Sequence, residues 1–364
     1  MQKYENTLKE TQRRGAENAA RAAENEKWMR RCLHLARCGR MSAAPNPMVG
    51  AVVVAHGRII GEGYHVRPGQ AHAEVNAISA VRPADRPLLR ESTIYVNLEP
   101  CAHYGRTPPC AELIIRTGIP RVVVGCVDPF SRVSGRGIDL LRRAGVEVTV
   151  GVLEAECREL NRRFITFHTH QRPYITLKWA VSSDGFIDRW RDAVSTPEEA
   201  APLSSPAGEG AEETAVAPPA ALSTSRSLLR VHRLRALNQA ILVGHNTLRL
   251  DRPRLDVRHW HGRNPLRIVL GSVAEGELPP GFTAFADIDT MLVALFRRGV
   301  QTLLVEGGSQ TLQSFIDRGL WDEAFEELSS VVLGSGVPAP RMPFGVPRVV
   351  ETAWGVSITH WRNV

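Results

Sequence analysis

The chain has 364 residues, of which 43% are hydrophobic and 23% are charged. This length predicts about two domains, and the composition is typical of a soluble globular protein, which excludes wholesale disorder, collagen and a coiled coil. The longest apolar run, Met48 to Ala55, is far shorter than the ~20 residues of a membrane helix, and the N-terminus has no apolar signal segment. We therefore expect a cytoplasmic protein with no membrane partner.

The net charge is +7, from 45 basic and 38 acidic residues. The basic residues are spread along the chain without runs of five or six, so we expect no nucleic-acid partner. Only four of them are Lys, and Lys178 is the only Lys after Lys27. A lone Lys at the end of a predicted strand is a candidate functional residue; the alternative is an ordinary solvated surface Lys.

The first predicted domain covers residues 27–150 and follows a polar, mostly helical extension, residues 1–26. An amphipathic helix begins at Lys27, and a hairpin with strands at Val49–Ala55 and Ile59–Tyr64 comes next. Further helices and strands then alternate, and we expect them at Ala71–Ala80, Thr93–Leu98, Ala111–Thr117, Arg121–Val127, Ile138–Ala144 and Glu147–Val152. Such alternation indicates an α/β layer structure.

A second α/β pattern covers residues 171–364. Its strands are predicted at Tyr174–Lys178, Ala240–Val243, Arg267–Leu270, Thr302–Glu306 and Glu326–Leu333. Residues 191–219 interrupt this pattern with a segment rich in Ala, Pro, Ser, Gly and Glu that has a net charge of −5. We expect a flexible surface insertion there, because the segment has too few apolar residues to offset the entropy of ordering it.

A His, two Cys and a carboxylate in the first domain form a candidate metal site. His72 and Glu74 open a predicted helix, Cys101 follows a strand, and Cys110 stands where another helix begins. Three such ligands leave an open position for water, as catalytic zinc requires, and Glu74 is placed to move a proton to a leaving amine. These parts predict a hydrolytic deaminase of an amino-heterocycle. On spacing alone, buried cysteines beside a surface His-x-Glu remain the alternative.

The chain has six cysteines. Because it is long and has no secretion signal, reduced thiols or a metal site are expected rather than disulfides. Four cysteines outside the candidate metal site fall within helix or strand patterns, and we interpret them as small core hydrophobes; these are Cys32, Cys38, Cys126 and Cys157.

Four segments resemble the deaminase half of the bifunctional riboflavin-biosynthesis deaminase/reductase family: Pro45–Gly50, Gly63–His65, His72–Val75 and Leu98–Cys110. The last includes eight residues between the cysteines, where the general deaminase signature has two. The resemblance implies a cytidine-deaminase-like α/β/α domain that removes the ring amine of a diaminohydroxyphosphoribosylaminopyrimidine. It assigns Zn²⁺ to His72, Cys101 and Cys110 and the proton shuttle to Glu74, and it places Asn46, His65, His103 and Arg106 around the substrate.

The second domain is similar to the reductase half of the same family, through Lys178–Gly185, Thr247–Arg258 and Val305–Gly308. The resemblance implies a dihydrofolate-reductase-like α/β fold in which NADPH reduces the ribosyl chain of the deaminated product to a ribityl chain. It assigns the cofactor to Ala180, Thr247, Asp251, Ser272, Gly307 and Gly308, and the substrate to Lys178, Arg235, Leu255, Arg258 and Glu306. We further expect a small-molecule substrate and a homo-oligomer.

Elementary chemistry supports part of this assignment. The substrate carries a phosphate, and the guanidinium groups of Arg235 and Arg258 are suited to bind a phosphate bidentately. Gly307 and Gly308 follow a predicted strand, so that backbone N–H groups there can approach a pyrophosphate.

The second domain also departs from the family pattern. Departures occur at Arg252, Asp256, Gly271 and Ala221–Ser223, and the interval from Ser272 to Thr302 is about half the usual length, which predicts the loss of one strand. A deaminase with a degenerate C-terminal domain in a structural or regulatory role is therefore the main alternative.

Two other classes of protein are weighed against this interpretation. A nucleoside, cytosine or tRNA-adenosine deaminase would have two residues between its cysteines, and the Val-Glu-Gly-Gly segment of the second domain would have no role in it. A zinc-stabilised RNA-binding module would need a fourth Cys or His at ligand spacing, and none stands there.

Overall fold

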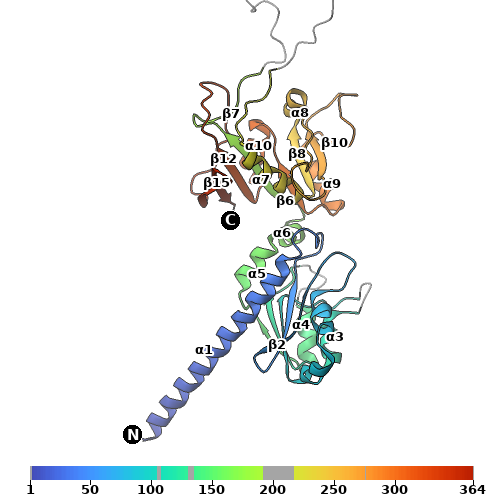
Figure 1. Cartoon of the computed structure of the whole chain (residues 1–364), viewed down its shortest axis with the longest axis vertical. Coiled ribbons are helices and arrows are strands. Elements are labelled where there is room, and N and C mark those ends of the chain that lie inside the picture. Colours follow the sequence, from blue (N-terminus) through green and yellow to red (C-terminus); the bar gives the residue numbers. More distant parts are fainter. Residues whose placement is uncertain (1, 105–107, 130–134, 192–216, 275, 364) are drawn as a thin grey trace, which may run out of the picture. The chain divides into compact units, whose positions relative to one another are not determined.

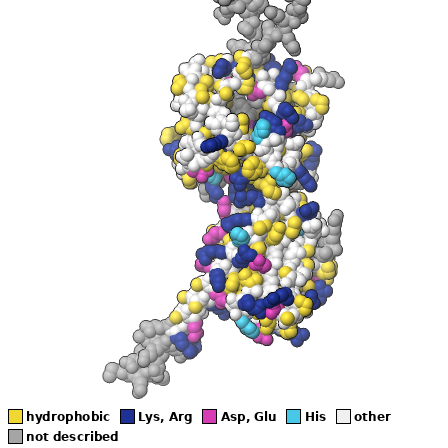
Figure 2. All heavy atoms as spheres, viewed as in Figure 1, with side chains coloured by type: hydrophobic (Ala, Val, Ile, Leu, Met, Phe, Trp, Pro, Cys, Tyr) yellow, Lys and Arg dark blue, Asp and Glu magenta, His cyan; other side chains and the backbone are white. Residues whose placement is uncertain are grey.

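The computed structural model describes residues 2–104, 108–129, 135–191, 217–274 and 276–363 (Figure 1). The chain divides into two compact units, Met1–Gln171 and Arg172–Val364, and each has its own sheet and core. Within the described ranges, no helix is long and apolar enough to cross a membrane. Figure 2 shows that on one face of each unit the Lys and Arg side chains are interspersed with acidic and hydrophobic ones.

A five-stranded sheet in the order β2-β1-β3-β4-β5 forms the middle of the first unit. Its strands are β1 (Gly50–Ala55), β2 (Arg58–Tyr64), β3 (Thr93–Leu98), β4 (Arg121–Cys126) and β5 (Glu147–Val150). Strand β1 is antiparallel to β2 and β3, whereas β3, β4 and β5 run parallel. Strands β1 and β4 are rich in Val, and β1, β3 and β4 are buried on both faces, as in sheets that helices cover on both sides.

Helices cover both faces of this sheet. They are α1 (Gln2–Arg37), α2 (Ala73–Ser79), α3 (Cys110–Thr117), α4 (Arg136–Arg143), α5 (Glu154–Leu160) and α6 (Arg162–His170), with a 3₁₀ segment at Pro83–Glu91. Met29 of α1 and Cys157 of α5 pack on one face of the sheet. Ala77 of α2, Ile114 of α3 and Leu141 of α4 pack on the other, so the first unit has the expected α/β/α architecture.

The polar extension, residues 1–26, continues without a break into the first amphipathic helix, and together they form α1. Residues 13–24 of this helix are exposed. From residue 13 onward, Asn25 is the first buried residue, and its side-chain oxygen accepts hydrogen bonds from Tyr95 Oη (3.3 Å) and Arg121 Nη2 (3.1 Å). The helix therefore joins the body of the unit at Asn25, close to the predicted start of the domain at residue 27.

The first unit also reaches Gln171, beyond the expected domain end at residue 150. Helix α5 returns to the sheet, where Cys157 packs in one cluster with Val123 and Cys126 of β4. Helix α6 follows it directly. Asn161, between the two helices, accepts a hydrogen bond from the Met48 backbone N–H (2.8 Å) and donates one to the Met48 carbonyl oxygen (2.9 Å). These contacts make residues 154–170 part of the first unit.

The second unit is built on an eight-stranded sheet in the order β10-β9-β8-β11-β6-β12-β15-β14. Its strands are β6 (Tyr174–Val181), β8 (Ala240–Gly244), β9 (Leu266–Leu270), β10 (Phe282–Phe285), β11 (Thr302–Val305), β12 (Glu323–Leu328), β14 (Arg348–Ala353) and β15 (Val356–Arg362). The first six strands in this order are parallel, and β15 and β14 continue the sheet antiparallel. A separate pair consists of β7 (Phe186–Asp188) and β13 (Val337–Pro338).

The described residues of this unit form four helices: α7 (Ser225–Ala236), α8 (His245–Asp251), α9 (Ile288–Arg297) and α10 (Ser309–Asp317). Helices α9 and α10 pack on one sheet face through Met291, Leu295 and Phe315. Helix α7 packs on the other through Leu234, beside Ile241 of β8. The unit is thus the expected dihydrofolate-reductase-like α/β domain.

Two details of the second unit differ from the sequence-based expectations. The short interval between Ser272 and Thr302 was expected to lack a strand, but it contains the strand β10 and the helix α9, and β10 pairs in parallel with β9. The strand predicted at Glu326–Leu333 lies earlier, at Glu323–Leu328, because the backbone N–H groups of Leu333 and Gly334 donate to the Asp184 carboxylate instead of pairing in the sheet. Most of the acidic insertion, residues 192–216, lies outside the described residues.

Candidate active sites

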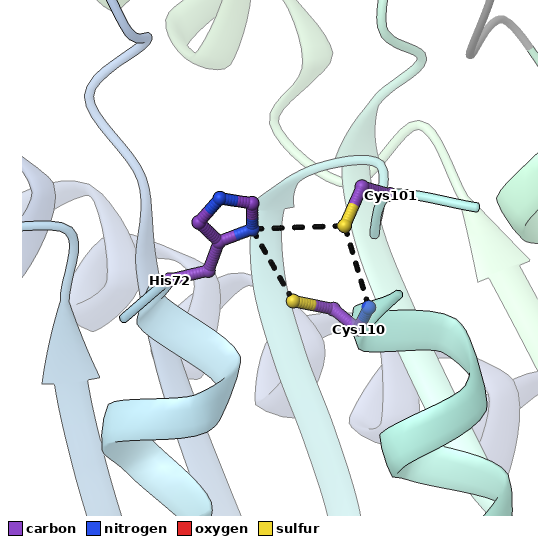
Figure 3. A group of neighbouring side chains, drawn as sticks. All are labelled: His72, Cys101 and Cys110. Atoms are coloured by element: carbon purple, nitrogen blue, oxygen red, sulfur yellow. Dashed lines mark hydrogen bonds between the residues drawn. The ribbon is translucent and has the colours of Figure 1, made fainter. Parts of the chain in front are cut away.

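Three segments of the first unit bring His72, Cys101 and Cys110 together (Figure 3). His72 immediately precedes α2, and Cys101 lies in the segment that follows β3. Cys110 is the first residue of α3, where Pro109 precedes it and favours a helix start. Strand β3 lies in the middle of the sheet, so the residues that follow it come close to the N-termini of both helices.

The geometry of these three side chains fits a zinc ion. His72 Nδ1 lies 3.6 Å from Cys101 Sγ and 3.4 Å from Cys110 Sγ, and the three ligand atoms are all within 4.8 Å of one another. One imidazole nitrogen and two sulfurs are a zinc donor set, and three protein ligands leave the fourth tetrahedral position for water or substrate. When bound, zinc supplies a Lewis acid that activates water for hydrolysis.

The polar environment of the two thiols favours a thiolate at Cys101, whereas the hydrogen bond to Cys101 and burial raise the pKa of Cys110. The pKa of Cys101 is lowered to about 4, first by a hydrogen bond from the Cys110 thiol and then by one from His72. The backbone N–H of Cys110 also donates to Cys101 Sγ (3.3 Å). Since zinc binds the thiolate, these hydrogen-bond donors prepare Cys101 as a ligand.

Glu74 lies in the first turn of α2 and is only 3% exposed. Burial raises the pKa of this carboxyl group to about 7, because the charged form loses its hydration. A carboxyl group whose pKa lies near neutrality can both accept and donate a proton at physiological pH. Glu74 therefore has the chemistry expected of the proton shuttle.

The expected substrate residues of the first unit are partly brought together. His65 is buried, its Nε2 lies 3.0 Å from Asn46 Nδ2, and its Nδ1 lies 3.1 Å from the Ala71 carbonyl oxygen. The rings of His65 and His72 make an edge contact at 5.5 Å. Asn46 and His65 thus lie beside the metal site. His103 is exposed, and Arg106 lies outside the described residues.

Sequence reasoning missed Glu99, which organises the loop beside the metal site. Its buried carboxylate accepts hydrogen bonds from the backbone N–H groups of Gly135 (2.9 Å) and Gly137 (2.9 Å). A Cβ atom on Gly137 would lie 1.9 Å from the carbonyl oxygen of Pro100, so only glycine fits there. Glu99 stands in the Leu98–Cys110 segment, two residues before Cys101, but its partners are more than thirty residues away and nothing local points to them.

The other cysteines do not share one environment. Cys32, Cys126 and Cys157 are fully buried within the apolar cluster beneath α1 and α5, as predicted. The prediction was wrong for Cys38, which is exposed. It follows the last residue of α1, where the chain turns away from the core into a loop.

In the second unit, the candidate residues gather at the carboxyl edge of the parallel strands. Lys178 and Ala180 lie toward the end of β6, Ser272 follows β9, and Glu306 follows β11. Thr247 lies in α8, directly after β8. The carboxyl edge of an open parallel sheet is where such folds bind ligands.

Gly307 and Gly308 connect β11 to α10 at this edge. A Cβ atom on Gly307 would lie 2.9 Å from Thr311 Cβ, and one on Gly308 would lie 3.3 Å from Thr247 Oγ1. The backbone N–H of Gly308 donates to Thr247 Oγ1 (3.1 Å), which ties the two neighbouring strand-to-helix turns together. A glycine turn at the N-terminus of α10 fits the pyrophosphate of a dinucleotide.

Lys178 on β6 and Glu306 directly after the neighbouring strand β11 lie near this turn. Lys178 is partly buried, and burial lowers the pKa of its amine while the charge of Glu306 opposes that change. Arg235 of α7 binds Glu306 through Nη2 (2.6 Å) and Nε (3.3 Å), and its Nη1 donates to the Asp256 carbonyl oxygen (3.2 Å). The Arg235 guanidinium is therefore held by the protein itself.

The remaining reductase candidates differ in accessibility. Ala180 is partly buried, Ser272 is exposed, and Arg258 pairs with Asp256 at 2.6 Å. Asp251 forms an ion pair with Arg191. Leu255 is 2% exposed and packs with Leu234 and Ile241, so its side chain belongs to the core.

Comparison with known proteins gives a family match for each of the two units. Residues 22–126 match the family described as "Cytidine and deoxycytidylate deaminase zinc-binding region", and residues 173–349 match the "RibD C-terminal domain". Fold, sites and matches together define a bifunctional enzyme, a zinc-dependent deaminase joined to an NADPH-dependent reductase.

Similar proteins of known name cover nearly the whole chain. The Riboflavin biosynthesis protein RibD of Aquifex aeolicus is 35% identical over 86% of this chain and 89% of its own length. The crystal structure of a diaminohydroxyphosphoribosylaminopyrimidine deaminase/5-amino-6-(5-phosphoribosylamino)uracil reductase from Thermotoga maritima has a TM-score of 0.75 and 33% identity, over 94% of this chain and 99% of that one. RibD of Acinetobacter baumannii has a TM-score of 0.77 and 28% identity over the same shares of the two chains. The chain belongs to the RibD family of riboflavin biosynthesis.

Proposed function

We propose that the chain carries out two consecutive reactions on one small-molecule substrate. The first unit removes the ring amine of diaminohydroxyphosphoribosylaminopyrimidine, and the second reduces the ribosyl chain of the product with NADPH. The observation that carries the first reaction is the group of His72, Cys101 and Cys110 beside the buried Glu74. The name of the Thermotoga maritima structure, which states both activities, supports the substrate.

In the deaminase half, His72, Cys101 and Cys110 hold zinc and Glu74 moves the proton. Asn46 and His65 form a fixed pair beside the ligands, because His65 Nδ1–H donates to the Ala71 carbonyl and Nε2 accepts from Asn46. This arrangement leaves the second N–H and the oxygen of the Asn46 amide for the heterocycle. His103 and Arg106 complete the substrate side by resemblance to the family.

In the reductase half, NADPH supplies the hydride, and the carboxyl edge of the sheet holds it. Gly307, Gly308 and Thr247 receive the pyrophosphate, with Ala180, Asp251 and Ser272 at the other cofactor positions. Arg258 binds the substrate phosphate. Lys178 and Glu306 face the reacting chain, and Arg235 fixes Glu306 by two hydrogen bonds. Leu255 borders the substrate through its backbone, since its side chain is in the core.

The deaminase domain in this proposal starts at residue 27 and includes α5 and α6, and the reductase domain is residues 171–364 with the insertion at 191–219.

We expect a homo-oligomer in the cytoplasm, with neither nucleic acid nor membrane as a partner. Light scattering of the purified chain measures the oligomer.

One assay tests both reactions. The purified chain is given the phosphoribosylaminopyrimidine with and without NADPH, while ammonia release and the absorbance of the nicotinamide are followed. We expect ammonia in both cases and oxidation of NADPH when it is present. Ammonia release without any oxidation of NADPH would favour a deaminase with a degenerate C-terminal domain.

A further inference from the structure

A buried group of charged side chains lies in the second unit on the sheet face beneath α7. Strands β6 and β12 pair so that Lys178 is opposite Phe325 and Ala180 is opposite Glu327. Paired residues of neighbouring strands, and residues two apart on one strand, point to the same face. Lys178, Phe325 and Glu327 therefore share one face. Arg230 of α7 covers it, with its guanidinium carbon 4.6 Å from the centre of the Phe325 ring.

Glu327 is unusual in this group. The residue is 0% exposed, and neither carboxylate oxygen has a hydrogen-bond partner among the described residues. Arg230 is 7% exposed, and its Nη1 also lacks a partner within the described part of the chain. A buried carboxylate without hydrogen bonds is costly, and neighbouring positive charge lowers that cost.

Two cations are within electrostatic reach of Glu327. Its charge is the strongest of the charges that raise the pKa of Arg230, and it also raises the pKa of Lys178. The groups that face Lys178 from the surrounding elements are Glu306 after β11, Glu327 on β12, and Arg230 and Arg235 on α7. Arg235 is already bound to Glu306, which leaves Glu327 as the negative group without a hydrogen-bonded partner.

We propose that Glu327 is a positioning residue of the reductase half, whose buried carboxylate keeps the Lys178 amine charged at the end of β6. This inference rests on the proposed role of Lys178 in the reductase site. Burial alone would drive the Lys178 amine toward its neutral form, and Glu306 is partly neutralised by Arg235. Glu327 supplies the second negative charge that opposes burial.

The charge state of Lys178 can be measured without any activity assay. The chain has only four Lys residues, so protein with ¹³Cε-labelled Lys gives a few resolvable signals, and Lys178→Arg identifies that of Lys178. In Glu327→Gln we expect the Lys178 signal to titrate at a pH lower by at least about half a unit, because the carboxylate no longer stabilises the ammonium. Glu327→Asp keeps the charge and should titrate closer to the wild type.

Glu326→Gln is the matched control. Glu326 is the adjacent residue of β12, points to the opposite face, and accepts a hydrogen bond from Trp179 Nε1 (3.0 Å) that Gln can also accept. This variant should leave the titration of Lys178 unchanged. An unchanged titration in Glu327→Gln overturns the inference, and so does an equal shift in both variants, which would indicate general loosening of β12.

Two further measurements separate this inference from the proposed function. If Lys178 acts in reduction, the alkaline limb of kcat/KM for NADPH oxidation should move to lower pH in Glu327→Gln with the Lys178 signal. If Lys178→Ala still reduces substrate, the role of Lys178 fails, whereas an inactive Lys178→Ala beside an unshifted Glu327→Gln refutes only the role of Glu327. If Glu327→Gln does not fold, the titration of the Lys178 signal is compared between Arg230→Gln and the Arg230→Gln/Glu327→Gln double variant. These two proteins differ only in the charge at residue 327, so the comparison tests the same loss of charge.

Discussion

At the scale of single residues, burial decides what the deaminase carboxylate can do. Glu74 and the three proposed ligands come from short, chemically distinctive segments, and for that reason the sequence alone predicts all four as site residues. What the sequence could not supply is the 3% exposure of Glu74, which raises its pKa to about 7. The helix pattern at Ala71–Ala80 does not tell which side chains turn inward beside the cysteines.

Glu74→Gln separates metal binding from proton transfer. The amide cannot shuttle a proton, but all three ligands remain, so we expect zinc content to stay unchanged while deamination falls by at least ~10²-fold. Elemental analysis and ammonia release on the same preparation measure the two effects. Glu91→Gln, on an exposed residue that pairs with His56, is the control and should retain full activity. Near wild-type turnover in Glu74→Gln would mean that Glu74 is structural.

Cys101→Ser tests the metal site itself. Serine replaces a thiolate by a weakly acidic hydroxyl, so we expect the chain to lose its zinc, about one ion per chain, and with it deamination. Cys38→Ser makes the same chemical change at the exposed cysteine and should keep both. Zinc-free wild-type protein that deaminates the substrate would refute the metal assignment.

At the scale of elements, the sequence predicted best where periodicity and burial agree. Strand β3 was predicted with its observed bounds, and β4 and α3 to within one residue, because each is a short apolar run between polar turns. Helices α5 and α6, the helices of the second unit, and strands β10, β14 and β15 were among the elements that were not predicted. Every residue of β14 except the last is exposed, and it therefore lacks the alternation that marks a half-buried strand. Its place in the sheet depends on pairing with β15, a contact that local sequence does not encode.

The close approach of α4 to the loop before Cys101 predicts that a larger residue at Gly137 destabilises the first unit. In Gly137→Ala the new Cβ would lie 1.9 Å from the Pro100 carbonyl oxygen, so either α4 or the loop must move. We expect a loss of about 1–3 kcal/mol in the free energy of unfolding, the usual cost of overpacking, together with weaker zinc binding. Denaturant unfolding and zinc titration measure these effects.

Gly15→Ala in α1 is the matched substitution for this test. No atom lies within 4 Å of the Cβ position at Gly15, and Ala favours a helix more than Gly does. Its stability should equal or slightly exceed that of the wild type. A Gly137→Ala variant as stable as Gly15→Ala would show that the loop carrying Cys101 adapts without cost, contrary to the role assigned to Glu99 and its partners.

At the scale of the whole molecule, two separate sheets carry two separate chemistries. The proposed zinc ligands belong to Met1–Gln171, and the glycine turn and Lys178 belong to Arg172–Val364. The sequence indicated this division through two successive α/β patterns. It could not indicate that residues 154–170 belong to the first unit, because Cys157 is the one residue of this segment among the buried members of the apolar cluster beneath α1, and the bond of Asn161 to Met48 is distant in sequence.

The division predicts that each reaction can be lost alone. Lys178→Ala removes a charged group from the carboxyl edge of the second sheet and leaves the first unit untouched, so we expect NADPH oxidation to fall below detection while ammonia release keeps its wild-type rate. Lys27→Ala removes the Lys that precedes the first buried turn of α1 and should leave both rates unchanged. Cys101→Ser gives the converse, since it stops ammonia release but should still oxidise NADPH when supplied with already deaminated substrate. Loss of both reactions in Lys178→Ala would show that the two units depend on each other for activity.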